Sequence, residues 1–264
     1  MSFEEALRHA TAKIGRRDAM LLLAHATGQS SAYIMLHPYE KLRGHAQFLQ
    51  NVERAAAGEP LQYIIGQWEF MGRVVKTDAR ALIPRPETEL LVEEALKFLA
   101  TVGNNAKVLD MCTGSGCIAA VVASAGYNVT AADISADALS LAQENGAGLG
   151  TEFVQSDLFE NICGLYDVII SNSPYITSGE MDTLDANVRE YEPHLALFGG
   201  DDGMDIYRRL IPDSLKHLKP GGALFLEIGP SEVRHIMEES GYANVKILQD
   251  YAGIDRFVSG ICNS

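Results

Sequence analysis

The segment from Lys107 to Asp133 limits the possible folds of this chain more than any other part of its sequence. A short apolar run, Lys107 to Met111, ends in a turn that contains Gly114 and Gly116. A stretch of small apolar residues follows, and a second apolar run ends at Asp133. This order is typical of a nucleotide-binding strand, turn, helix and strand, in which glycines let the backbone approach a ligand and the distal carboxylate binds ribose hydroxyls.

The alternation of strands and helices continues beyond this segment. We expect helices over residues 136–145, 206–215 and 231–239, and strands near residues 153–154, 167–171, 223–228, 245–248 and 256–259. This order predicts an α/β fold with a mostly parallel sheet, covered by helices on both faces and closed by a final pair of strands.

The first part of the chain has a different pattern. Residues 1–62 carry apolar positions at helical spacing and no strand pattern, which predicts a small domain of four or five short helices. Residues 63–80 alternate and turn at glycines, so we interpret them as a β-hairpin connector. Residues 81–264 then form the α/β domain.

The tetrapeptide Asn172 to Tyr175 directly follows the strand predicted over 167–171, which places it at the carboxyl edge of the sheet, where ligands bind. Asn172 offers a side-chain carbonyl, Ser173 a backbone carbonyl next to Pro174, and Tyr175 a flat aromatic face. Together these groups could hold a planar amide or amino group. The alternative is a turn that merely ends a strand, which the tetrapeptide alone favours.

Arg85 stands between Pro84 and Pro86, on a stiff approach to a helix that Pro86 begins. Two early carboxylates, Glu87 and Glu89, support that helix start. Arg85 is therefore a candidate substrate-binding residue on a rigid loop, and initiation of the helix is the simpler alternative.

Composition and charge oppose several classes of function. Lys and Arg number 21 against 35 Asp and Glu, and the formal net charge of −14 disfavours stable binding of nucleic acid. The four cysteines form no C-x-x-C pair, so we predict neither a metal site nor a disulfide framework. The amino-terminal residues lack a signal-peptide pattern and no apolar run could span a bilayer, so we expect a cytoplasmic protein without a membrane segment.

These motifs resemble those of S-adenosylmethionine-dependent methyltransferases with an Asn-Pro-Pro-Tyr loop. The matching motifs are Asp110-x-x-Thr113-Gly114-Ser115-Gly116, Asp133, Asp157-Leu158-Phe159 and Asn172-x-Pro174-Tyr175. Four further segments are similar to one branch, the release factor glutamine N5-methyltransferase family (HemK or PrmC): residues 58–63, 84–89, 192–193 and 220–222. The resemblance spans nearly the whole chain. It implies a Rossmann-like seven-stranded methyltransferase sheet, with a closing antiparallel pair and an all-helical amino-terminal domain that docks the substrate.

The resemblance also implies the reaction and its site. The cofactor would be S-adenosylmethionine, the product S-adenosylhomocysteine, and the substrate the glutamine of the Gly-Gly-Gln motif in class-1 peptide chain release factors. The implied cofactor-binding residues are Cys112, Thr113, Gly114, Ser115, Gly116, Asp133, Asp157, Leu158 and Asn172. The implied catalytic and substrate-binding residues are Asn172, Ser173, Pro174 and Tyr175, with Arg85 as a further substrate-binding residue. No metal is required, and we expect a monomer.

Two positions depart from the family pattern. Cys112 stands where the family usually has glycine, and Ser173 stands where it has proline. These two departures keep open a non-catalytic S-adenosylmethionine-binding protein. A second alternative is a nucleic-acid adenine N6-methyltransferase, which would hold an amino group in the same way. Such an enzyme is expected to have a basic face or a target-recognition domain, and this acidic sequence shows neither.

Overall fold

The structure is a computed structural model that describes residues 1–229 and 232–263, and its chain divides into two compact units. The helical unit comprises Met1–Gln67 together with Asp185–Tyr191, and the sheet unit comprises Trp68–Leu184 and Glu192–Ser264. The chain thus contributes to the helical unit twice, which the sequence did not lead us to expect. The domain boundaries predicted at residues 62 and 80 stay predictions.

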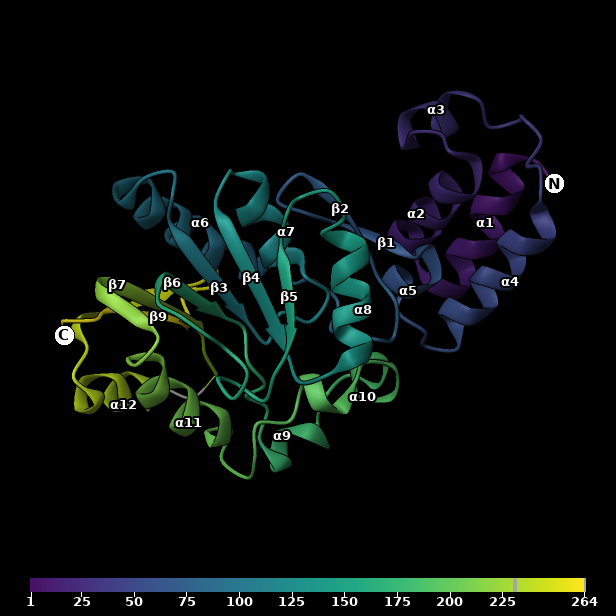
Figure 1. Ribbon diagram of the computed structural model, residues 1–264. Helices are drawn as coiled ribbons and strands as arrows, with labels where there is room; N and C mark the ends of the chain where they lie inside the picture. Colours follow the sequence, from purple (N-terminus) through teal and green to yellow (C-terminus); the bar gives the residue numbers. More distant parts are fainter. Residues whose placement is uncertain (230–231, 264) are drawn as a thin grey trace. The chain divides into compact units, whose positions relative to one another are not determined.

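The helical unit consists of short helices around one apolar core (Figure 1). The helices around this core are α1 (Phe3–Ile14), α2 (Arg16–Thr27), α3 (Ser31–Leu36), α4 (His45–Ala56) and α5 (Leu61–Ile65). The short helix α10 (Ala186–Tyr191) also belongs to this unit but has no buried side chain. Residues 63–65, which we predicted in the hairpin, belong to α5, because Gly66 takes the left-handed conformation that ends this helix. The hydroxyl of Tyr191, at the end of α10, donates to the Ala57 carbonyl at 3.4 Å.

The sheet unit begins within the first strand of a hairpin formed by β1 (Gln67–Phe70) and β2 (Arg73–Lys76). Its helices are α6 (Pro86–Val102), α7 (Cys117–Ser124), α8 (Ala136–Asn145), α9 (Ser178–Met181), α11 (Asp205–Ser214) and α12 (Val233–Ser240), with a 3₁₀ turn at His194–Ala196. Its main strands are β3 (Lys107–Met111), β4 (Asn128–Asp133), β5 (Glu152–Gln155), β6 (Tyr166–Ser171), β7 (Leu218–Glu227), β8 (Ala243–Gln249) and β9 (Asp255–Ile261).

These seven strands form one sheet in the order β5-β4-β3-β6-β7-β9-β8. The pairs from β5 to β7 are parallel, and β9 runs antiparallel to both β7 and β8. The predicted α/β fold with a closing antiparallel pair is confirmed. Strand β7 begins at residue 218, earlier than predicted, because Leu218 already pairs with Tyr166 ahead of a register shift. The predicted start of α12 at Ser231 lies outside the described residues.

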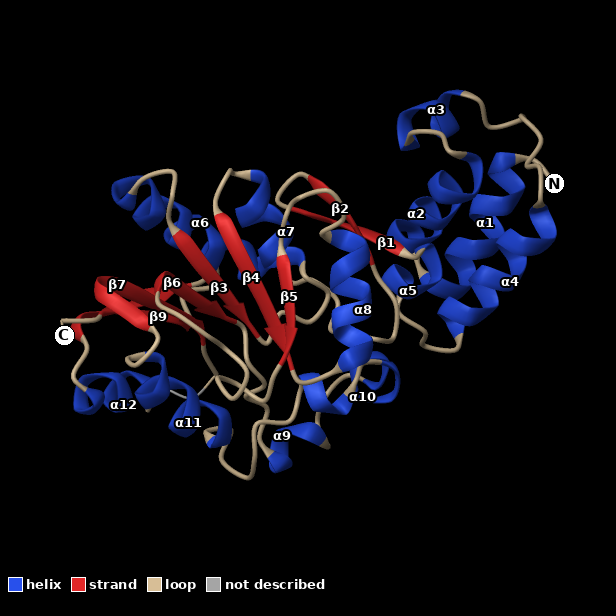
Figure 2. Ribbon diagram, viewed as in Figure 1, coloured by secondary structure: helices blue, strands red, loops and turns tan. Residues whose placement is uncertain are grey.

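Helices cover both faces of the sheet (Figure 2). Successive residues of β3 point to opposite faces: Val108 packs with α6 and α7, whereas Leu109 packs with α11 and α12. Both faces of the central strands are therefore buried, as a parallel sheet requires. Within residues 1–229 and 232–263, no helix combines the length and the apolar character needed to cross a membrane.

The strand order reverses between β3 and β6. From β3 the chain proceeds to β4 and β5 on one side, and then returns to β6 on the other side. In the register, Met111 and Ser171 are partners, and the Ser171 hydroxyl donates to the Met111 carbonyl at 2.7 Å. The glycine turn after β3 and the tetrapeptide after β6 therefore emerge side by side at the switch point, where open α/β sheets bind their ligands.

Asp110 ties β3 to the glycine turn. Its Oδ2 atom accepts the Thr113 hydroxyl at 2.6 Å and the Ala119 amide at 3.0 Å. Its Oδ1 atom is buried and meets no donor among the described residues. Burial raises the pKa of Asp110 to about 7, because the charged carboxylate loses its water.

We expect Asp110→Asn to flatten the pH dependence of the unfolding free energy between about pH 4 and pH 7. In that window native Asp110 holds a proton that the unfolded chain has released, so wild-type stability falls as pH rises, by on the order of 4 kcal/mol at most. Asparagine keeps an acceptor for Thr113 and Ala119 and carries no titrating charge. Urea unfolding at several pH values measures how the unfolding free energy changes with pH. An equal slope of that free energy against pH in the wild type and in Asp110→Asn would contradict the prediction.

Candidate active site

A cavity of about 440 Å³ lies in the sheet unit, at the carboxyl edge of the sheet, and its volume is in the usual range for a cofactor site. Most predicted site residues line it: Arg85, Cys112, Thr113, Gly114, Ser115, Asp133, Asp157, Leu158, Asn172 and Pro174. Gly116, Ser173 and Tyr175 are not among the lining residues. The structure thus brings together motifs from the ends of four adjacent strands, β3, β4, β5 and β6.

The glycine turn keeps a left-handed backbone at three positions. Cys112, Gly114 and Gly116 have φ values of +60°, +53° and +76°. A Cβ atom on Gly116 would lie 2.8 Å from Ala142 Cβ, so this glycine lets the turn pack against α8. Cys112 takes a conformation that favours glycine and costs other residues roughly 1–2 kcal/mol. Burial raises the pKa of its thiol well above the ordinary range, which favours the protonated form of Cys112.

Asp133, at the end of β4, is held by two backbone amides. Its Oδ2 atom accepts from Gly114 N at 2.8 Å, and its Oδ1 atom accepts from Ser135 N at 2.9 Å. Each carboxylate oxygen retains a second lone pair, so Asp133 can still accept from hydroxyl donors in the cavity. Burial raises the pKa of Asp133.

We expect Asp133→Ala to weaken S-adenosylmethionine binding by about 1.5–3 kcal/mol, the range for hydrogen bonds to a charged group. The variant removes the acceptor for hydroxyls and also the anchor of the Gly114 amide. Isothermal titration calorimetry measures the change, with Asp213→Ala as the control because Asp213 forms an ion pair with Lys216 on the surface and does not line the cavity. An unchanged dissociation constant would remove Asp133 from the site.

Asp157 and Leu158 follow β5 on the same edge of the sheet. Asp157 Oδ2 forms an ion pair with Arg209 of α11 at 2.9 Å, and both residues line the cavity. Leu158 is buried with φ at +48°, and its carbonyl accepts the Ser156 hydroxyl at 2.6 Å. These contacts fix the loop after β5 in an unusual backbone conformation at the cavity wall.

The tetrapeptide after β6, which we call the transfer loop (Asn172–Tyr175), is held by a second set of contacts. The Asn172 side-chain nitrogen donates to Thr88 Oγ1 at 3.1 Å. Ser173 is buried, and its hydroxyl has no partner among the described residues. The Tyr175 hydroxyl lies 3.4 Å from Glu227 Oε1. Burial raises the pKa of Tyr175 to about 12, so its hydroxyl remains a neutral donor.

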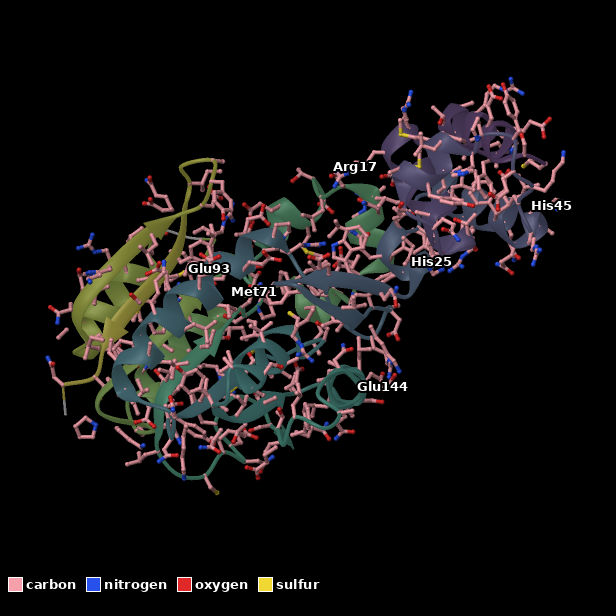
Figure 3. The ribbon with its side chains drawn as sticks, turned by 90° about the horizontal axis from the view of Figure 1, so that it is seen from above. Arg17, His25, His45, Met71, Glu93 and Glu144 are labelled. Atoms are coloured by element: carbon pink, nitrogen blue, oxygen red, sulfur yellow. The ribbon has the colours of Figure 1, made fainter. Side chains whose placement is uncertain are left out.

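Arg85 is engaged by a buried carboxylate. Its Nη2 atom donates to Glu192 Oε1 at 2.6 Å, and Glu192 Oε2 accepts the Ile83 amide at 3.1 Å. Its assignment to substrate binding stays a prediction. A second arginine at the cavity, Arg80, is also held by an acid, since its Nη1 atom donates to Glu144 of α8 at 2.8 Å. Glu144 is labelled in Figure 3.

Sequence reasoning did not select four residues of this site: Thr88, Glu192, Arg209 and Glu227. Thr88 and Glu192 stand within quoted motifs, where helix initiation and a loop explained them. Glu227 had a signal of its own, because it is a charged residue within the otherwise apolar run from Ala223 to Ile228. A charge at such a position is rarely buried without a partner.

The comparisons with known proteins match both parts of the chain. Residues 2–66 match the family described as the PrmC N-terminal domain, and residues 86–195 match the methyltransferase small domain. The release factor glutamine methyltransferase of Koribacter versatilis (strain Ellin345) is 42% identical to this chain, with 98% of this chain and 96% of that protein covered. The chain belongs to the release factor glutamine methyltransferase family.

A second member of the release factor glutamine methyltransferase family, from Deinococcus radiodurans, is 38% identical, with 98% of each protein covered. The family resemblance drawn from the motifs is thereby confirmed. Among solved structures, the methyltransferase from Pyrococcus furiosus has a TM-score of 0.53 at 19% identity, over 83% of this chain and 98% of that one. That likeness supports the fold, a Rossmann-like methyltransferase sheet.

Proposed function

We propose that this protein transfers a methyl group from S-adenosylmethionine to the side-chain amide nitrogen (N5) of the glutamine in the Gly-Gly-Gln motif of class-1 peptide chain release factors. One observation carries the proposal: Asn172 lines the cavity and is held through its side-chain nitrogen, so its carbonyl oxygen is left for a substrate amide. The relationship to release factor glutamine methyltransferases over nearly the full chain supports this choice of substrate.

The residues of the cavity fit S-adenosylmethionine. Asp133 has acceptor capacity for ribose hydroxyls, Gly114 leaves the turn open to a close approach, and Asp157 and Leu158 would flank the adenine. When bound, the cofactor supplies an electrophilic methyl group on its sulfonium sulfur.

The transfer loop makes the substrate nitrogen reactive by positioning it. An amide nitrogen is a poor nucleophile because its lone pair is delocalised into the carbonyl. Asn172 Oδ1 and the Ser173 carbonyl would each accept one of its N–H bonds, which aims the nitrogen and favours the positive charge that develops on it. Any residue supplies the backbone carbonyl at position 173, so serine in place of proline retains this acceptor.

Three further assignments concern the location of the enzyme, its binding of nucleic acid and its oligomeric state. Because release factors act in translation termination, we propose that the enzyme works in the cytoplasm. The net charge of −14 opposes a stable complex with nucleic acid. We propose that the enzyme acts as a monomer.

A radiolabelled methyl-transfer assay tests the proposal. Full-length release factor, the same factor with its Gly-Gly-Gln glutamine replaced by alanine, and duplex DNA are offered side by side. We expect label only on the unaltered release factor. Label on DNA alone would favour an adenine N6-methyltransferase, and cofactor binding without transfer to any substrate would favour a non-catalytic protein.

A further inference from the structure

We propose that Thr88 and Glu227 are positioning residues that set the orientation of the Asn172 side-chain amide, and so determine which of its atoms faces the substrate. The inference rests on the proposed function, because it concerns Asn172 as the acceptor of the glutamine amide. Neither residue lies in the transfer loop itself.

The three side chains form a chain of hydrogen bonds. The Thr88 hydroxyl donates to Glu227 Oε2 at 2.6 Å, and the Asn172 side-chain nitrogen donates to Thr88 Oγ1 at 3.1 Å. Thr88 lies in the first turn of α6, Glu227 at the end of β7 and Asn172 just after β6. Thr88 and Glu227 are each 2% exposed, so little water competes for these bonds.

The direction of the bonds follows from the chemistry of the three groups. An ionised carboxylate only accepts, and a hydroxyl has one proton to donate. Because the Thr88 hydroxyl uses its hydrogen in the bond to Glu227, the Thr88 oxygen presents a lone pair to Asn172. Only the NH₂ side of the amide can meet this lone pair, because a flipped amide would set two acceptors against each other. Oδ1 must then point away from Thr88, and no described residue donates to it.

Glu227 is itself held in place. The Tyr207 hydroxyl donates to the Glu227 backbone carbonyl at 2.8 Å. Burial raises the pKa of the Glu227 carboxyl and Glu87 of α6 acts in the same direction, whereas the Thr88 hydroxyl, Arg256 of β9 and the Tyr175 hydroxyl lower it. The assays are run at pH 8, well above the ordinary carboxyl pKa of about 4.3, to favour the ionised state that the chain of bonds requires.

A purely structural role is the competing explanation, since the same bonds also join α6 to β7. The two explanations differ in what a substitution changes. A structural role predicts losses that follow stability and cofactor binding. A positioning role predicts a loss in kcat that depends on the presence of the Asn172 side chain.

The experiment replaces Thr88 with valine, which keeps the shape and removes the hydroxyl. We expect kcat on the release factor to fall about tenfold to a hundredfold, the range expected for the loss of a buried hydrogen bond. The cofactor dissociation constant and the KM for release factor should stay within about threefold of the wild-type values. Thr88→Ser restores the hydroxyl and should recover most of the activity. Thr130→Val is the matched control, because Thr130 is a buried β4 threonine that bonds Glu152 away from the cavity.

A double-mutant cycle with Asn172→Ala decides between the two roles. Without the Asn172 amide there is nothing to orient, so Thr88→Val should cause no further loss. An equal fold loss with and without the Asn172 side chain would overturn the proposal, as would a wild-type kcat for Thr88→Val.

Nuclear magnetic resonance of the enzyme alone separates this inference from the proposed function. The side-chain ¹H–¹⁵N signals of Asn172, assigned by their loss in Asn172→Ala, should shift in Thr88→Val and return in Thr88→Ser. Unshifted signals would overturn the inference. Absence of methyl transfer by the wild-type enzyme would instead count against the proposed function.

Discussion

Replacing Asn172 with alanine should lower kcat on the release factor by about a hundredfold or more, the effect of losing one group that stabilises developing charge. The substitution deletes the side-chain acceptor at the cavity and leaves the backbone carbonyl of Ser173 in place. The dissociation constant of S-adenosylmethionine should change far less, because Asp133 and the glycine turn stay intact. Single-turnover transfer of labelled methyl and calorimetry measure the two effects separately.

Asn128→Ala is the matched control for this experiment. Asn128 is exposed at the first residue of β4, and therefore at the opposite edge of the sheet from the cavity. We expect it to behave as the wild type. Near-full methyl transfer by Asn172→Ala would show that the amide is not held as proposed.

Replacing Glu192 with alanine should lower the free energy of unfolding of the sheet unit by about 3 kcal/mol. The Glu192 side chain is 1% exposed, and it joins the Ile83 amide to the Arg85 guanidinium. Its removal leaves an N–H group buried without an acceptor and a cation without its partner. Urea unfolding followed by tryptophan fluorescence measures the loss, since Trp68 belongs to this unit.

Glu94→Ala provides the comparison for Glu192→Ala. Glu94 also pairs with a cation, Lys97, but on the surface of α6, where such pairs contribute at most about 1 kcal/mol. If both variants lost the same small amount of stability, the Glu192 pair would contribute no more than a surface pair.

The α/β class of the fold and the edge of the sheet at which the candidate site lies could be predicted because their signals are local. The segment from Lys107 to Asp133 contains a complete strand, turn, helix and strand, and the transfer loop directly follows an apolar strand. The Rossmann-like rule then places both at one edge. No knowledge of side-chain contacts was needed for this step.

The contacts that hold the site could not be predicted in the same way. Thr88 is 139 residues from Glu227 and 84 from Asn172 in the sequence. The register of β6 with β7 places Asn172 beside Glu227, and the packing of α6 on these strands brings Thr88 to both. The short helix α10 was missed for a related reason. It spans six residues without a buried side chain, so it has no apolar periodicity to reveal which unit it joins.

The membership of α10 in the helical unit has a consequence for exchanging parts between relatives. Residues 2–66 match one family description and invite transplantation as a single block, yet the hydroxyl of Tyr191 bonds the Ala57 carbonyl at the end of α4. In a chimera that takes only the first 66 residues from another enzyme, Tyr191 would contact the end of an α4 helix from a different protein. The exchangeable module is therefore discontinuous, and a graft that preserves its packing must carry residues 185–191 from the same donor.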